Sequence, residues 1–125
     1  MLKIREEQLA ALRIPLVRRF DQKLLRHVRE HFQEETENRS DAELLDHIRQ
    51  ALDRALTYGL RKGQDLFKYV NVSMVYGPDF DESEETAWLR EYLIDDDVPD
   101  PSQRAHRLHE AVIHRLRSEE DSMPE

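Results

Sequence analysis

One stretch of the sequence has the residue types and spacing for metal chemistry, and it lies between His27 and His31. Its residues, His27-Val28-Arg29-Glu30-His31, match the pattern H-x-x-E-H. In that pattern two histidines one helical turn apart bind zinc, and the glutamate acts as a general base. A hydrolase also needs a third ligand and a cleft, and so short a pattern is easily met by chance, so we favour a pair of histidines at a solvated helix margin over a metal site. A metal-dependent hydrolase is therefore the third of our three hypotheses for function.

Other residues that could do chemistry lack the neighbouring groups that a metal or catalytic site needs. His106 and His109 lie three residues apart, with His114 nearby, and their polar surroundings are typical of surface histidines. The acidic clusters lack the spacing of an EF-hand calcium loop, and no nucleophile-elbow glycines are present. We expect no enzyme activity, no cofactor and no metal site, with His27 and His31 as the weak metal candidates.

Charged side chains instead suggest a protein partner. A basic stripe runs along one helix face, and two acidic segments follow in the second half of the sequence. The alternative for each is a solvated face or loop, or pairing between the two within the chain. The basic candidates for partner binding are Arg18, Arg19, Lys23, Arg26 and Arg29. The acidic candidates are Asp79, Asp81, Glu82, Asp95, Asp96 and Asp97.

Composition excludes several classes of protein. The 125 residues include no cysteine and only three glycines, and the formal net charge is −8. This rules out disulfide scaffolds, thiolate metal sites, P-loops and dinucleotide-binding loops. Residues 1–62 hold 13 Lys and Arg against 11 Asp and Glu, whereas residues 63–125 hold 6 against 16. Such an acidic second half disfavours nucleic-acid binding and favours a basic protein partner.

The chain has no apolar window long enough to span a membrane, and its N-terminus becomes charged at once. We therefore expect a cytoplasmic protein. Its length suits one domain, predicted as a helical domain over residues 1–117 with a disordered acidic tail over residues 118–125.

Helical periodicity of apolar residues dominates the first half. Leu16 to Phe32 carries apolar residues at three- and four-residue spacing, and Pro15 suits the first turn of that helix. We expect Glu6 to Leu12 to be a separate turn or short helix, with a kinked continuous helix as the alternative. Ser40-Asp41-Ala42-Glu43 forms a capping box that predicts a second helix, which should end at Tyr58-Gly59.

Three further helices are predicted in the second half. Asp65 to Tyr76 alternates like a strand over residues 69–75, but a lone strand would have no partner, so we expect a central apolar helix. Phe80 should fold back onto the core. Glu82 to Ile94 reads as the next helix, with Trp88 and Tyr92 among its apolar members, and a last helix runs from Pro101 or Ser102 to about Arg117. The fold class is all-α, a compact bundle of about five helices.

Several short motifs in the sequence are similar to motifs of a known protein family. These motifs are Ala55-Leu56-Thr57-Tyr58-Gly59-Leu60, Asp65-Leu66, Lys68-Tyr69-Val70, Gly77-Pro78-Asp79-Phe80-Asp81 and the predicted helix with Trp88. They resemble small uncharacterised all-helical bacterial proteins encoded beside type VI secretion spike, PAAR and toxin genes. The resemblance spans most of residues 5–116 and implies an accessory part for an effector. It brings no catalytic residues.

The main hypothesis is thus a cytoplasmic adaptor or chaperone that holds a secreted effector or loads it on a secretion spike. The second is an immunity protein that neutralises a toxin by placing an acidic surface in its basic cleft. Both hypotheses name another protein, an effector, a toxin or a spike component, as the partner.

Overall fold

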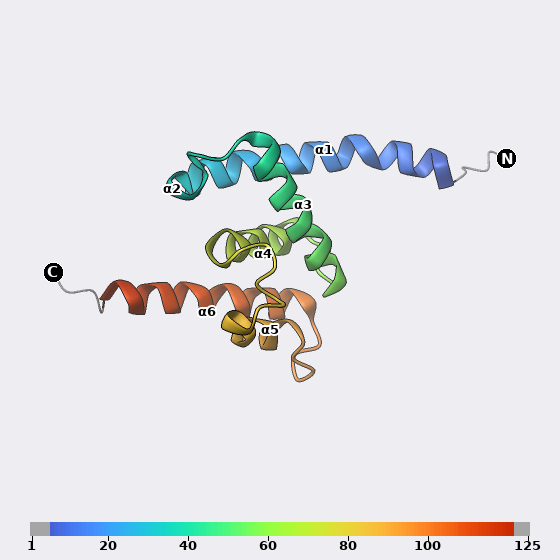
Figure 1. Ribbon diagram of the computed structural model, residues 1–125. Coiled ribbons are helices and arrows are strands. Elements are labelled where there is room, and N and C mark those ends of the chain that lie inside the picture. Colours follow the sequence, from blue (N-terminus) through green and yellow to red (C-terminus); the bar gives the residue numbers. More distant parts are fainter. Residues whose placement is uncertain (1–5, 122–125) are drawn as a thin grey trace. The chain divides into compact units, whose positions relative to one another are not determined.

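The computed structural model describes the backbone of residues 6–121 and the side chains of residues 19–120. All regular structure within that range is helical, and no strand occurs there (Figure 1), which confirms the predicted all-α class. In chain order the elements are α1 Glu6–His31, α2 Gln33–Thr36, α3 Asp41–Thr57, α4 Gly63–Tyr76, the 3-10 helix η1 Glu84–Thr86, α5 Ala87–Leu93 and α6 Pro101–Asp121.

The chain divides into two compact units, Met1–Ile48 and Arg49–Glu125. The sequence predicts one helical domain over residues 1–117 instead. The boundary between the units lies within α3, so this helix contributes residues to both.

In the first unit, α1 continues through Pro15, so the predicted break between Leu12 and Pro15 is wrong. Proline removes one helical hydrogen bond, which the good helix formers on both sides can outweigh. The predicted apolar face is confirmed where side chains are described, because Leu24 and Val28 are fully buried.

The start of α3 matches the predicted capping box. The backbone N–H of Glu43 donates to the Ser40 hydroxyl oxygen at 3.1 Å, which satisfies one of the free amides at the helix start. The Ser40 hydroxyl in turn donates to the Glu43 carboxylate at 3.1 Å. The short helix α2, which precedes this start, was absent from the sequence prediction. Its Thr36 is buried and donates its hydroxyl to the Phe32 carbonyl at 2.7 Å.

In the second unit, α3 ends at the predicted glycine. Gly59 has a φ of 84°, and the N–H of Leu60 donates to the Ala55 carbonyl at 3.2 Å while the N–H of Gly59 donates to Leu56 at 3.1 Å. These two bonds form a Schellman motif, which satisfies the last carbonyls of the helix. Leu60 is consequently buried just after the turn.

The helix predicted over residues 65–76 is confirmed as α4, and the strand alternative for residues 69–75 is excluded. Seven of its 14 residues are buried, as its apolar composition requires. It ends at Gly77, whose φ of 102° suits glycine. Phe80 then turns inward and is fully buried, as predicted.

The helix expected to start at Glu82 begins later, with η1 at Glu84 and α5 at Ala87. Residues 79–82 are used in a turn, in which the Glu82 N–H donates to the Asp79 carbonyl at 2.9 Å. The buried hydroxyl of Thr86 donates to the Phe80 carbonyl at 2.5 Å and fixes this turn against the helix start. That bond depends on tertiary packing, which helix-start signals in the sequence do not report.

Helix α6 packs against both α4 and α5 (Figure 1). It begins at Pro101, where the Asp100 carboxylate accepts from the Ser102 N–H at 3.1 Å, as expected for a helix start. It ends at Asp121 rather than near Arg117, so the first residues of the expected tail are helical. No helix in the part of the chain that the structure describes has the length and apolar character needed to cross a bilayer.

Candidate partner-binding site

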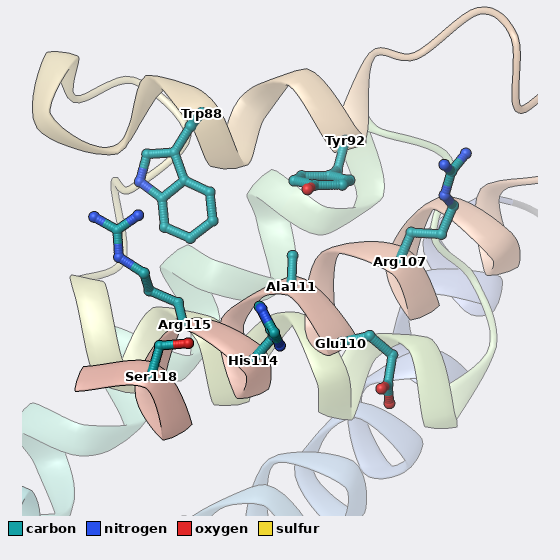
Figure 2. Close-up of a pocket in the computed structure, with 8 residues that line it drawn as sticks. All are labelled: Trp88, Tyr92, Arg107, Glu110, Ala111, His114, Arg115 and Ser118. Carbon is teal, nitrogen blue, oxygen red and sulfur yellow. The ribbon is translucent and has the colours of Figure 1, made fainter. Parts of the chain in front are cut away.

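A groove of about 830 Å³ opens between α5 and α6 in the second unit. Figure 2 shows Trp88 and Tyr92 extending from α5 toward α6, with Ala111 opposite them and Arg115 beside the indole of Trp88. The lining residues are Trp88, Tyr92, Arg107, Glu110, Ala111, His114, Arg115 and Ser118.

Two aromatic side chains form the wall that α5 contributes. Trp88 and Tyr92 lie four residues apart, so both face the same side of the helix, while Leu89 and Leu93 occupy the neighbouring stripe and are buried. Both aromatic residues remain half-buried, which leaves part of each ring accessible. A seven-residue helix with leucines in the core thus presents a Trp and a Tyr to solvent.

Trp88 is held from two sides. The ring of Tyr76 contacts it edge-on, with centroids 6.0 Å apart and an interplanar angle of 88°. The Arg115 guanidinium carbon lies 5.3 Å from the indole centroid, within the range of a cation–π interaction. An interaction of this kind contributes roughly 0.5–1 kcal/mol at an exposed site. The indole is therefore positioned before any partner arrives.

Helix α6 contributes a small floor between two positive charges. Arg107, Ala111 and Arg115 are spaced four residues apart and follow one face of the helix. The Ala111 methyl group leaves room above the helix, and the arginine side chains are 56% and 58% exposed. Each arginine has a carboxylate partner: Asp95 lies 3.9 Å from Arg107, and Arg115 Nε donates to Glu119 at 3.4 Å.

A second polar cluster surrounds the buried Asp81 and does not line the groove. We call Arg54, Tyr58 and Asp81 the Asp81 latch. Asp81 Oδ2 accepts from Arg54 Nε at 3.0 Å and from the Tyr58 hydroxyl at 2.7 Å, and Arg54 also pairs with Glu82. Because the Asp81 side chain is fully buried, these donors offset the cost of removing its charge from water. The latch fastens the loop after α4 to the end of α3.

The pKa shifts around the latch follow from burial and from these bonds. The hydrogen bonds to Glu82 and Asp81 raise the pKa of Arg54 above its usual range. Burial, and then the hydrogen bond to Asp81, raise the pKa of Tyr58 to about 12. Burial also raises the pKa of the neighbouring Tyr69. The Tyr69 hydroxyl and Asp81 Oδ1 are buried without a hydrogen-bond partner among the described residues.

Two predicted partner-binding residues have internal roles instead. Asp81 is enclosed in its latch with its side chain fully buried, and its role in docking stays a prediction. Arg29 donates to the carbonyls of Thr36 at 2.5 Å and Arg39 at 2.8 Å, and it pairs with Asp41 at 2.7 Å. These contacts fasten the end of α2 to the start of α3. The contacts of both residues depend on the folded chain, so sequence alone could not separate either residue from its charged neighbours.

The remaining acidic candidates lie on the surface of the second unit. Asp79, Glu82, Asp96 and Asp97 are exposed, whereas Asp95 is partly buried. The loop with Asp95 is held by Arg104, which the sequence analysis did not single out. Its guanidinium donates to the carbonyls of Leu93, Val98 and Pro99 at 3.1, 2.6 and 2.9 Å.

The basic stripe on α1 is partly described. Arg19, Lys23 and Arg26 are exposed, at spacings that place them on one face of the helix. The side chain of Arg18 lies outside the described residues.

The histidine pair of the H-x-x-E-H pattern forms a ring contact. The centroids of His27 and His31 lie 4.6 Å apart, with the planes tilted by 45°. Between residues 19 and 120 there is no group of three or more His, Cys, Asp or Glu side chains arranged to hold a metal ion.

The groove therefore combines accessible aromatic rings, guanidinium groups and a small floor in one place. The sequence analysis did not find it, because Trp88 and Tyr92 were counted only among the apolar members of the predicted helix. The available signal was the Leu89 and Leu93 stripe, which leaves the two aromatic residues on an adjacent face of α5. No protein-family model, curated protein or solved structure matches this chain.

Proposed function

We propose that this protein is a non-catalytic protein-binding accessory factor and that the groove between α5 and α6 is its partner-binding surface. The supporting observation is the groove's composition. Trp, Tyr and Arg are the residue types most enriched among the side chains that dominate binding energy in protein interfaces. Trp88, Tyr92 and Arg115 line one groove with a small-residue floor, and Trp88 is already fixed by two neighbours. Such preorganisation lowers the entropy cost of binding.

The partner we propose is a secreted effector or a component of a type VI secretion spike, bound in the cytoplasm by an adaptor or chaperone. This choice of partner rests on the sequence resemblance around Tyr58-Gly59 and Gly77-Pro78-Asp79-Phe80-Asp81. The groove supports only the more general function, protein binding.

The test is co-purification with the effector and spike proteins encoded beside this chain's gene, followed by a secretion assay. Trp88→Ala should abolish co-purification and secretion, because it removes the largest accessible ring in the groove. The matched control is Ile94→Ala, which removes an apolar side chain that is 50% exposed and lies outside the groove. Unchanged co-purification of a folded Trp88→Ala variant would contradict the proposed surface.

A specific observation also supports the second function, an immunity protein. Asp79, Glu82, Asp96 and Asp97 are exposed carboxylates that a basic toxin cleft could accept. If this function holds, Asp79→Lys combined with Asp96→Lys should remove the protection of cells expressing the toxin. Trp88→Ala should leave protection intact. The opposite pattern would favour the groove.

A further inference from the structure

The two histidines of the H-x-x-E-H pattern lie together at the end of α1, in the first unit. His27 and His31 are one helical turn apart, which places both side chains on the same face of the helix. His27 is half-buried and His31 is exposed, so an ion in solvent can reach this face. The sequence pattern by itself favours a solvated pair, and the geometry of the rings is a further observation.

The separation of the imidazole rings matches that of two ligands on one metal ion. Their centroids lie 4.6 Å apart, with the planes tilted by 45°. Two imidazoles bound to one ion at about 2.0–2.1 Å per bond, with a tetrahedral or octahedral angle between the bonds, have centroids roughly 4.5–5.2 Å apart. Each ring can turn about its own metal–nitrogen bond, so a tilt of this size is compatible with chelation. The helix therefore holds the two rings at the separation that a shared ion requires.

We propose that His27 and His31 bind one divalent transition-metal ion, such as Ni²⁺, Cu²⁺ or Zn²⁺, through one ring nitrogen each. Imidazole is a preferred ligand of these ions. Between residues 19 and 120 no group of three or more His, Cys, Asp or Glu side chains is arranged to hold a metal ion, so we assign the remaining coordination positions to water. Neither histidine lines the groove, and the site goes beyond the proposed function.

The charges around the pair permit a bound cation. His31 is the last residue of α1, and the C-terminal end of a helix carries a partial negative charge that favours positive ions. The neighbouring Glu30 is an exposed carboxylate, and the guanidinium of Arg29 is engaged in an ion pair at 2.7 Å. Lys23 and Arg26 oppose a cation, but both are exposed, so solvent and salt screen them.

A metal ion bound in this way stabilises the end of α1. The two imidazoles meet the ion together where the chain is helical, because the unfolded chain does not fix their spacing. An ion that binds the folded state more tightly than the unfolded state raises the free energy of unfolding. The melting temperature is therefore a second readout beside the binding measurement.

The experiment titrates the whole protein, without an affinity tag, with Ni²⁺ and separately with Mg²⁺, and follows binding by calorimetry. We expect one Ni²⁺ per chain and no binding of Mg²⁺, which prefers oxygen ligands. In NMR spectra the paramagnetic Ni²⁺ should broaden the imidazole signals of His27 and His31 before those of the other histidines. The melting temperature should rise with added Ni²⁺.

Variants assign the binding to the two histidines. His27→Ala and His31→Ala should each weaken Ni²⁺ binding at least about tenfold and remove the rise in melting temperature, because a single imidazole cannot chelate the ion. His31 is exposed at the helix end, so its replacement leaves the core of the first unit in place. The matched control is His106→Ala, which removes an exposed histidine on α6 and should leave both readouts unchanged.

Three results would overturn the site. They are unchanged Ni²⁺ affinity of the folded His31→Ala variant, loss of binding in His106→Ala, and absence of binding by the native protein at millimolar Ni²⁺. None of them bears on the proposed function, whose test is the loss of co-purification in Trp88→Ala.

Discussion

At the scale of single residues, two tyrosines near Asp81 differ in whether their buried hydroxyl groups have a hydrogen-bond partner. The Tyr58 hydroxyl donates to Asp81 Oδ2 at 2.7 Å, whereas the Tyr69 hydroxyl is buried without a partner among the described residues. A hydrogen bond to a buried carboxylate stabilises the fold, and an unsatisfied buried hydroxyl destabilises it. The same chemical change, Tyr to Phe, should therefore have opposite effects at the two positions.

We expect Tyr58→Phe to lower the free energy of unfolding by about 1–2 kcal/mol, because Asp81 loses a donor that offsets its burial. Tyr69→Phe should leave the free energy of unfolding unchanged or raise it by about 1 kcal/mol, because it removes the unsatisfied hydroxyl. Urea unfolding of the two variants measures both values. A larger loss for Tyr69→Phe than for Tyr58→Phe would show that the latch is described incorrectly.

His109 gives the fold a dependence on pH. Burial, and next the charge of Lys68, lower its pKa from the ordinary value of 6.5. The unfolded chain therefore binds this proton more readily than the folded protein does. Its contribution to stability is present above pH 6.5 and is lost as the pH falls through the folded pKa.

The free energy of unfolding should accordingly decrease between about pH 7.5 and pH 5.5, and His109→Gln should make this decrease shallower. Glutamine keeps a hydrogen-bonding group near Asn71, which lies 3.4 Å from His109 Nε2. His114→Gln, at an exposed position, is the control and should retain the native slope. An identical slope for native protein and His109→Gln would contradict the assignment.

At the scale of elements, local signals predicted the helix ends well. The capping box at Ser40 and the glycine ends at Gly59 and Gly77 are confirmed, because each depends on residues within one turn. The predicted start of the helix at Glu82 was wrong, because the observed start depends on the bond between the Thr86 hydroxyl and the Phe80 carbonyl. The predicted helix break before Pro15 was wrong, because the surrounding helix formers outweigh one missing hydrogen bond. The groove was missed for a similar reason, since it needs α5 and α6 together.

The end of α4 provides an element-scale prediction. Gly77 has φ 102° and ψ 158°, a region essentially restricted to glycine, and a Cβ there would also lie 3.4 Å from an Asp79 carboxylate oxygen. Gly77→Ala should lower the free energy of unfolding by about 1–3 kcal/mol. Gly63→Ala is the matched control, because Gly63 begins α4 without a positive φ and alanine favours helix. Thermal unfolding of both variants tests the difference, and equal melting temperatures would refute it.

At the scale of the whole molecule, net charge alone gives an incomplete picture of which partners fit. The chain has a formal charge of −8, concentrated in residues 63–125, which favours a basic partner. Those same residues form a groove that holds both signs of charge, because Arg107 and Arg115 share one face of α6 while Glu110 lines the groove and Asp95 and Glu119 pair with the arginines. Asp79 and Asp96 are exposed and do not line the groove. Composition therefore could not predict the groove, which arises where the aromatic rings of α5 meet charged side chains of α6.

The most direct test of the central claim is hydrogen–deuterium exchange of the protein with and without its co-purified partner. We predict slower exchange in residues 87–93 and 107–118, which form the walls of the groove, and unchanged exchange in residues 79–85 and 95–100. Protection confined to the two acidic segments, with the groove helices unchanged, would contradict the claim that this groove is the partner-binding surface.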